Sequence, residues 1–552
     1  MRSIHTLSIA IVAVVLLTAC KKLDTREDVL LTEKNIASDY STINGFGYTA
    51  YSKVKNGFNV IDNNLFAAVS DEAEQTASTA QSQLFTSGGW NAFNNPDNVY
   101  GNCYEGIRAA NYFLEKFINY KTLLAVNRDT MSDQSRSYLL DVQNIAMLRS
   151  ENRVLRSYFY FELIKRYGGV PLVTKTLAIT DNTDLPRASF DEVVNYIVSE
   201  IDAVKDSLQT DWKSFDQSRD GRLTKAAALA IKARVLLYAA SPLHNPGHDL
   251  LKWQKAAMAA QDIIALNQFS LSSDYQSLFV ADNTNINSET IWAIRMGPNN
   301  DLEKMNYPIG TPGGNSGVTP SLNLVEAYEP TGNVDPADPF ANRDPRLAFS
   351  IATNNSNWNG RTMEIWAGGK DASTNTNASR TGFYLKKFLS DNLNLVQNES
   401  KLRSWIVFRY AEILLNYAEA MNEAYGPDND NGYGLTARQA INQLRNRPAV
   451  LLAPVTAFSQ LEMRNKIKLE RRVELAFEDH RYWDLLRWMD AEQLLNLPLR
   501  GIRVDKTANN DFNYSGFIVE NRKFIAPQMY YYPIPQTEMS KSKGIMKQNP
   551  GW

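Results

Sequence analysis

The stretch Arg149–Val173, RSENRVLRSYFYFELIKRYGGVPLV, joins a long helical pattern to a definite stop. Apolar side chains recur at helical spacing at Leu155, Phe159 and Leu163, which predicts one buried face. The glycine pair that follows can take the left-handed conformation that ends a helix, and Pro171 cannot continue one. We therefore expect a long helix that leaves in an extended segment.

The composition is that of an ordinary globular protein. The chain has 552 residues, of which 44% are hydrophobic, 21% charged and 11% aromatic. Lys and Arg number 58 against 60 Asp and Glu, which gives a net charge of -2. This balance offers no electrostatic case for binding nucleic acid or an anionic membrane surface. We therefore expect no nucleic-acid partner.

The first residues resemble a secretory leader. Arg2 precedes an apolar run from Ile9 to Leu17, and Leu-Thr-Ala-Cys20 follows at once. The run is too short to span a bilayer, which takes about 20 residues. Leu-x-Ala-Cys resembles the bacterial lipobox, so we expect residues 1–19 to be a signal peptide and Cys20 to be acylated. A plain signal peptide beside an incidental cysteine is the alternative.

Helical patterns in series predict a mostly α fold. Residues 20–34 are polar and suit a tether. Residues 35–270 then read as an N-terminal helical repeat region, interrupted by a loop-rich segment at 57–98. The alanine-rich helix expected at 223–240 and its successor at 253–266 resemble one tetratricopeptide unit, and Ala-x-(Val/Ile)-Leu-Leu recurs at residues 411–415. We expect a tetratricopeptide-like helical scaffold.

Residues 271–400 interrupt this scaffold. They are rich in Asn, Gly, Ser, Thr and Pro and show little helical period. The runs 290–295 and 383–388 are predicted to be short strands. We interpret the segment as a large irregular insertion that binds the ligand.

The C-terminal region, residues 401–552, returns to helical patterns at Trp405–Ala424 and Ile467–Leu495. The second stretch predicts a dense ion-pair surface, formed by Glu470, Arg471, Arg472, Glu474, Glu478, Asp479 and Arg481. Such carboxylates can mimic a glycosidase pair, but alternating charges along one helix more simply solvate it or pair with its neighbours. We therefore expect no catalysis here.

Several of these stretches, in this order, resemble the SusD/RagB family of surface glycan-binding lipoproteins. They are the lipobox cysteine, RSYFYFELIKRYGGVPL, the turn at residues 185–187, FRYAEILLNYAEA, RRVELAFEDHRYWDLLRW, YPIP and the terminal QNPG-aromatic. The resemblance implies an outer-membrane protein, exposed at the cell surface and held by lipid only, that passes oligosaccharide to a SusC-like TonB-dependent transporter. It names neither the glycan nor the stoichiometry of that complex.

Candidate ligand-binding residues come from their placement in polar loops. A sugar ring has an apolar face that aromatic rings cover and hydroxyls that amides or carboxylates bind. As stacking residues we predict Trp90, Tyr307, Trp358 and Trp366. As hydroxyl partners we predict Asp71, Asn91 and Asn94.

The sequence contains no nucleophile elbow, phosphate-binding loop or metal-ligand spacing. We therefore expect a protein that is not an enzyme and needs no cofactor or metal. Three alternatives to glycan capture stay open: an assembly or lid subunit of the transporter that binds no sugar, capture of peptide or glycopeptide, and a glycosidase.

Overall fold

The computed structural model describes residues 38–178, 180–181, 184–280 and 287–552. These residues are mostly helical with short scattered strands, which confirms the predicted fold class. The helices are α3 (Tyr40–Thr49), α4 (Ser82–Ser87), α5 (Tyr100–Lys116), α6 (Tyr120–Leu124), α7 (Arg136–Tyr167), α8 (Phe190–Val204), α9 (Trp212–Phe215), α10 (Lys225–Ala240), α11 (Leu250–Ile264), α12 (Asp301–Asn306), α13 (Leu322–Val325), α14 (Arg346–Ser350), α15 (Tyr410–Tyr425), α16 (Ala437–Arg445), α17 (Gln460–Glu474), α18 (Arg481–Arg487), α19 (Ala491–Leu494) and α20 (Gln536–Lys541). The strands are β1 (Ala73–Gln75), β2 (Thr290–Asn299), β3 (Val318–Pro320), β4 (Ile351–Ala352), β5 (Asn357–Trp358), β6 (Arg361–Thr362), β7 (Tyr384–Leu385), β8 (Lys401–Arg409), β9 (Leu499–Lys506) and β10 (Phe512–Glu520).

Helix α7 ends as its sequence predicts. Gly168 has φ 69°, and its N–H donates to the carbonyl of Ile164 at 3.1 Å. Arg187 then donates to the carbonyls of Tyr167 and Gly169 at 2.7 and 2.6 Å. Its guanidinium satisfies acceptors that the helix end leaves open. The segment after the glycines is therefore fixed against the start of α8.

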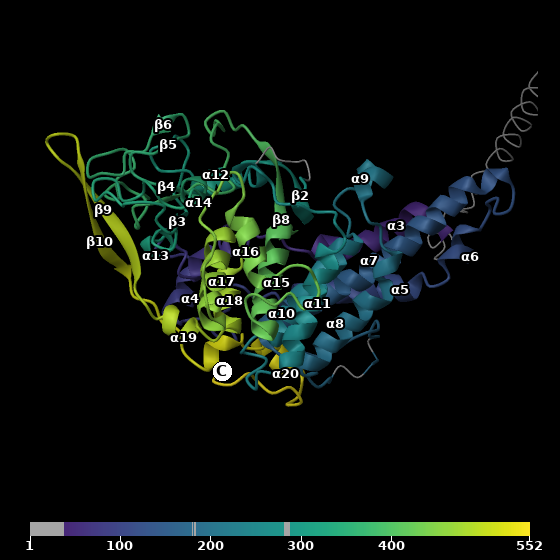
Figure 1. Ribbon diagram of the computed structural model, residues 1–552. Coiled ribbons are helices and arrows are strands. Elements are labelled where there is room, and N and C mark those ends of the chain that lie inside the picture. The colour runs from purple at the N-terminus through teal and green to yellow at the C-terminus, as the bar shows by residue number, and fades with distance from the viewer. Residues whose placement is uncertain (1–37, 179, 182–183, 281–286) are drawn as a thin grey trace, which may run out of the picture.

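Neighbouring helices pack in pairs of the tetratricopeptide kind. Helix α7 packs between α5 and α8, and α11 packs between α10 and α15. Helix α15 also contacts α16 and α17, so the chain returns to the helical scaffold after the insertion. Figure 1 shows these helices as the body of the molecule, with the irregular segment above it. The alanines of α10 allow close approach: Ala226, Ala230 and Ala233 are at most 1% exposed.

Strands β2 and β8 bring the two ends of the irregular segment together. They form an antiparallel ladder in which Ile294 lies opposite Trp405 and Thr290 opposite Arg409. The prediction that Trp405–Arg409 is helical is therefore wrong. This stretch is the C-terminal part of β8, and α15 begins only at Tyr410. Its helix-like pattern arises from a strand that is buried along most of its length.

The predicted helix Ile467–Leu495 is broken into α17, α18 and α19. Phe477, Asp479 and Met489 have φ values of 66°, 62° and 62°, in the left-handed region. Non-glycine residues in this region are strained, so other contacts must stabilise them. At the first break Lys387 donates to the carbonyl of Ala476 at 2.9 Å. The turn is therefore held by tertiary contacts that helical periodicity does not report.

Candidate functional site

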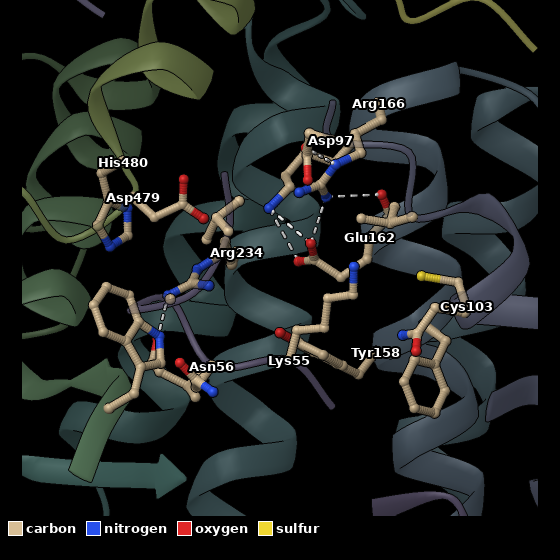
Figure 2. Close-up of a pocket in the computed structure, with 18 of the residues that line it drawn as sticks. Lys55, Asn56, Asp97, Cys103, Tyr158, Glu162, Arg166, Arg234, Asp479 and His480 are labelled. Carbon is tan, nitrogen blue, oxygen red and sulfur yellow. Dashed lines mark hydrogen bonds and ion pairs between the residues drawn. The ribbon is translucent and has the colours of Figure 1, made fainter. Parts of the chain in front are cut away.

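The two longest motifs of the sequence meet at one pocket lined by several charged side chains. Helix α7 contributes Glu162, Lys165 and Arg166, and the turn between α17 and α18 contributes Asp479 and His480. Figure 2 shows Asp479 and His480 facing Glu162 and Arg166 across the pocket, with Arg234 from α10 below the turn. The pocket is therefore the place where the scaffold helices and the C-terminal helices are joined.

Opposite charges fill one wall of this pocket. Arg166 donates to Asp97 at 2.7 Å and to Glu162 at 2.6 Å, and Lys165 donates to Glu162 at 3.0 Å. Burial by itself raises the pKa of Glu162, but Lys165 and Arg166 outweigh it and lower the pKa to about 2. Arg166 also lies 4.7 Å above the ring of Trp483. These charges are mutually satisfied and hold α7 against α18.

Three other titratable groups of the pocket, Cys103, His480 and Asp479, have pKa values shifted toward the neutral form. Burial raises the pKa of Cys103 to about 12, so its thiol stays protonated. Burial and then Arg234 lower the pKa of His480 well below its usual value. Burial raises the pKa of Asp479 to about 6, and the indole of Trp483 donates to its carboxylate at 3.1 Å. Cys103 and His480 are thus not activated as a nucleophile and base.

The pocket is too small for an oligosaccharide. Its volume is about 80 Å³. Ligand sites generally measure about 300–1,000 Å³, whereas one water occupies about 30 Å³. The pocket therefore suits a few water molecules. The role of its lining residues is to hold the neighbouring helices together.

The predicted ion-pair surface of residues 470–481 is mostly buried, which corrects that prediction. Glu474 is 0% exposed and Glu478 is 7% exposed. Arg409 donates to Glu289, Glu474 and Glu478 at 2.8, 2.7 and 2.7 Å. Burial would raise the pKa of Glu474, but Arg447 and Arg409 lower it. These groups tie β2, β8 and α17 together and do not solvate a helix.

Asp71 belongs to the same kind of interior network. It is 9% exposed and accepts from Arg481 and Arg472, each at 2.7 Å. Burial opposes its ionisation, but these two guanidiniums lower the pKa of Asp71. Both carboxylate oxygens are therefore engaged. The prediction that Asp71 binds sugar hydroxyls is wrong for this conformation.

Three of the predicted stacking rings are covered. Trp90, Tyr307 and Trp358 are 2%, 0% and 4% exposed. Trp90 lies against Phe85 at 4.7 Å between ring centroids, and Tyr307 meets Trp358 edge to face at 5.6 Å. Their rings fill the core under the polar loops, because a large apolar ring gains more by packing than by exposure. The prediction that they form platforms for a sugar is wrong for this conformation.

Trp366, the fourth predicted stacking ring, is partly buried and lies against the β9–β10 ribbon. Phe512 of β10 covers its ring at 5.3 Å between centroids, and the ammonium of Lys506 lies 4.7 Å from the ring centroid. It shares no ring partner with Trp90 or Trp358 among the described residues. The predicted tryptophans therefore do not form one stacking surface.

The loop that contains Trp90 presents a different ring. Phe93 is 84% exposed, and Asn91 and Asn94 beside it are also exposed. The side-chain oxygen of Asn91 accepts from the N–H groups of Phe93 and Asn94 at 2.9 and 3.2 Å, which closes the turn. The N–H of Gln536 in α20 donates to the carbonyl of Ala92 at 3.0 Å.

Sequence reasoning selected Trp90 by its placement in this polar loop and missed Phe93, which lies in the same loop. The available signal was a phenylalanine inside a run of asparagines, where no apolar helical face requires it. Asn91, Asn94 and Phe93 together give a flat apolar ring beside amide groups. That is the chemistry a sugar ring needs.

Cys20, the predicted acylation site, lies outside the described residues. Over the ranges that are described, every helix is either too short or too polar to cross a bilayer.

The fold places the chain in the class of tetratricopeptide-like helical proteins, and comparison with known proteins identifies the family. A model described as the SusD family matches residues 283–552, and one described as starch-binding associating with outer membrane matches residues 22–237. The chain belongs to the SusD/RagB family.

Individual relatives agree with this assignment. A SusD-like protein of Formosa agariphila is 28% identical over 378 residues, covering 64% of this chain and 69% of that protein. A SusD-like protein of Bacteroides ovatus is 24% identical over 396 residues, covering 69% and 68%.

Solved structures share the fold. A SusD-like protein from Bacteroides fragilis superposes with a TM-score of 0.76 at 24% identity, covering 95% of this chain and 99% of that one. A SusD-like carbohydrate-binding protein from the same species gives a TM-score of 0.74 at 24% identity, covering 93% and 99%.

Proposed function

We propose that this protein captures an oligosaccharide at the bacterial cell surface and delivers it to a SusC-like TonB-dependent transporter in the outer membrane. Family membership supports the proposal, as does the similarity to a solved protein described as carbohydrate-binding. The observation that carries it is the exposed ring of Phe93 beside two exposed asparagines, on a loop whose base is fixed in the core. The protein acts as a binding subunit and not as an enzyme.

The ligand stacks on Phe93, and the amides of Asn91 and Asn94 bind its hydroxyls. Such a solvated site binds at roughly micromolar to millimolar strength. Weak binding suits a protein that must release its ligand to a transporter. Trp366 stays a candidate contact for the ligand. A movement of the Lys506 side chain away from its ring would expose that ring.

The anchoring is part of the same proposal. Acylation of Cys20 holds the chain in the outer membrane, and residues 21–34 tether it. The membrane contact is through lipid alone. Labelling cells with an azide-bearing fatty acid should mark the wild-type chain and leave Cys20→Ala unmarked. Equal labelling of both would contradict this anchor.

Isothermal titration against a panel of oligosaccharides tests the capture step. We expect binding by the wild-type chain, at least a tenfold loss for Phe93→Ala, and no change for Phe458→Ala, whose ring is 89% exposed elsewhere. Co-purification with the transporter provides the second readout, which Phe93→Ala should leave intact.

Other outcomes distinguish the alternatives. Co-purification without binding to any sugar or peptide favours an assembly or lid subunit. Binding to peptides alone favours peptide or glycopeptide capture. Release of new reducing ends from a bound glycan identifies a glycosidase and overturns the proposed function.

A further inference from the structure

The ribbon formed by β9 and β10 stands away from the helical body. Figure 1 shows it as a yellow arm at the left margin of the molecule. It is antiparallel, with Ile502 opposite Gly516 and Val504 opposite Tyr514. Phe517 and Ile518 of β10 are 37% and 59% exposed. An isolated two-stranded ribbon is only marginally stable in water. The contacts at the two edges of this ribbon therefore matter for its stability.

One edge of this ribbon is closed by residues of the irregular segment 271–400. The N–H of Ile502 donates to the carbonyl of Thr381 at 2.8 Å, and the carbonyl of Val504 accepts from Ala367 at 3.1 Å. The N–H of Arg500 donates to the side chain of Asn323 at 2.8 Å. These three residues of β9 therefore point their backbone groups away from β10.

The register then fixes which groups of β10 point outward. In an antiparallel pair, two opposite residues either bond to each other or both face away. Arg500, Ile502 and Val504 lie opposite Ile518, Gly516 and Tyr514. These three residues of β10 accordingly direct their N–H and C=O groups to the outer edge. Within the described part of the chain, no hydrogen-bond partner meets those groups.

Nothing in the sequence of β10 protects this edge. Exposed edge strands usually carry lysine, proline or an inward charge that prevents pairing with another chain. Residues 512–519, FNYSGFIV, contain none of these. The first charge along the strand is Glu520, which is already paired with Arg522 at 2.7 Å. A second strand of the same sequence would therefore meet no opposing like charge.

We propose that this edge pairs, antiparallel, with β10 of a second copy of this chain. With Gly516 at the two-fold axis, outward-facing residues meet outward-facing residues, as the hydrogen-bond pattern requires. Tyr514 then lies opposite Ile518 of the second copy, twice, which is a favourable aromatic and β-branched pair. On the other face Phe517 lies opposite Ser515. Two ribbons become one four-stranded sheet, which covers the exposed Ile518 side chains.

A disulfide at the two-fold axis tests the register in cells that produce the full chain. Hydrogen-bonded antiparallel residues lie about 5.5 Å apart between Cα atoms, within the roughly 4.4–6.8 Å that a disulfide spans. A Cβ at 516 would lie 3.3 Å from the side-chain ends of Arg500 and Leu322 and 3.9 Å from the carbonyl oxygen of Gly501, so the nearest neighbours are side chains that can move. Gly516→Cys should therefore give a dimer on oxidation. Asn513→Cys, opposite Val519 in this register, is the matched control and should not, and the buried Cys103 does not compete.

Sedimentation equilibrium of the purified chain gives the second measurement. Ile518→Lys should weaken self-association at least tenfold, because a lysine would face Tyr514 at the paired edge. Phe458→Lys, on an exposed loop elsewhere, should leave self-association unchanged. Cross-linking of Gly516→Cys no greater than that of Asn513→Cys overturns the proposal. So does association that Ile518→Lys leaves unaltered, or a wild-type chain that stays monomeric at every concentration. None of these results depends on sugar binding.

Discussion

The rings of Trp90 and Trp552 lie 4.7 Å apart between centroids, so residue 552 covers an indole whose loop begins more than four hundred positions earlier in the chain. Tyr532 meets the same indole edge to face at 4.9 Å. This aromatic base fixes the loop that presents Phe93. The stability of the C-terminal segment and the presentation of the candidate sugar-binding ring are therefore linked.

Trp90→Ala and Phe93→Ala should behave differently although they lie in one loop. Trp90 is 2% exposed, and removing a buried Trp costs about 3–5 kcal/mol because a cavity remains. Phe93 is 84% exposed, so Phe93→Ala should change the free energy of unfolding by about 0.5 kcal/mol or less. Urea denaturation measures both. Equal destabilisation would show that Trp90 is not the packing residue of the loop.

Arg409→Met should destabilise the fold strongly. Arg409 is 1% exposed and contacts three carboxylates, which would be left buried with fewer partners. Removing one partner of a buried ion pair costs about 3–5 kcal/mol. Arg500→Met is the control, because its pair with Glu326 is exposed on both sides and should contribute about 1 kcal/mol or less. Guanidinium denaturation of the two variants compares them, and similar midpoints would refute the structural role of the buried network.

Glu72 should make stability fall as the pH rises. Burial and then Asp71 raise the pKa of Glu72 to about 8. The folded state therefore holds a proton that the unfolded chain releases near pH 4.5, so this contribution is complete below that pH and is lost as the pH approaches 8. Each unit of pKa difference corresponds to about 1.4 kcal/mol. Glu72→Gln should reduce the loss of stability between pH 5 and 8, measured by urea unfolding at both.

The exposed Glu105→Gln is the control for this pH dependence, because its side chain is 63% exposed. Carboxylates with lowered pKa, such as Glu162, act in the opposite direction at lower pH. The comparison is therefore confined to the range above pH 5. A slope in Glu72→Gln equal to that of the wild type would contradict the assignment.

The second glycine of the opening motif should tolerate no side chain. A Cβ at Gly169 would lie 2.3 Å from the carbonyl oxygen of Ala188, which belongs to the backbone and cannot turn aside. Gly169→Ala should therefore lower the melting temperature by several degrees or prevent folding. Gly101→Ala in α5, where no atom lies within 4 Å, should stabilise by about 0.4–1 kcal/mol. Thermal unfolding followed by circular dichroism compares the two, and a harmless Gly169→Ala would refute the close approach.

The sequence by itself determined the helical scaffold, the stop after α7 and the family. These features depend on local period, on glycine and proline conformation, and on motifs that are read along the chain. The stop after α7 is one example, since Gly168 has φ 69° and Pro171 follows it closely in the chain. Such local signals can be read from the sequence alone.

Only the tertiary structure decided which rings are covered and which charges are buried. Trp90 is covered by Tyr532 and Trp552, and Glu474 is neutralised by Arg409 and Arg447, all of them distant in sequence. A loop tryptophan looks the same whether it is a platform or a core residue, and an alternating charge pattern looks the same whether it is solvated or enclosed. Burial is a property of the partners that arrive from elsewhere in the chain, and the one-dimensional pattern does not contain them.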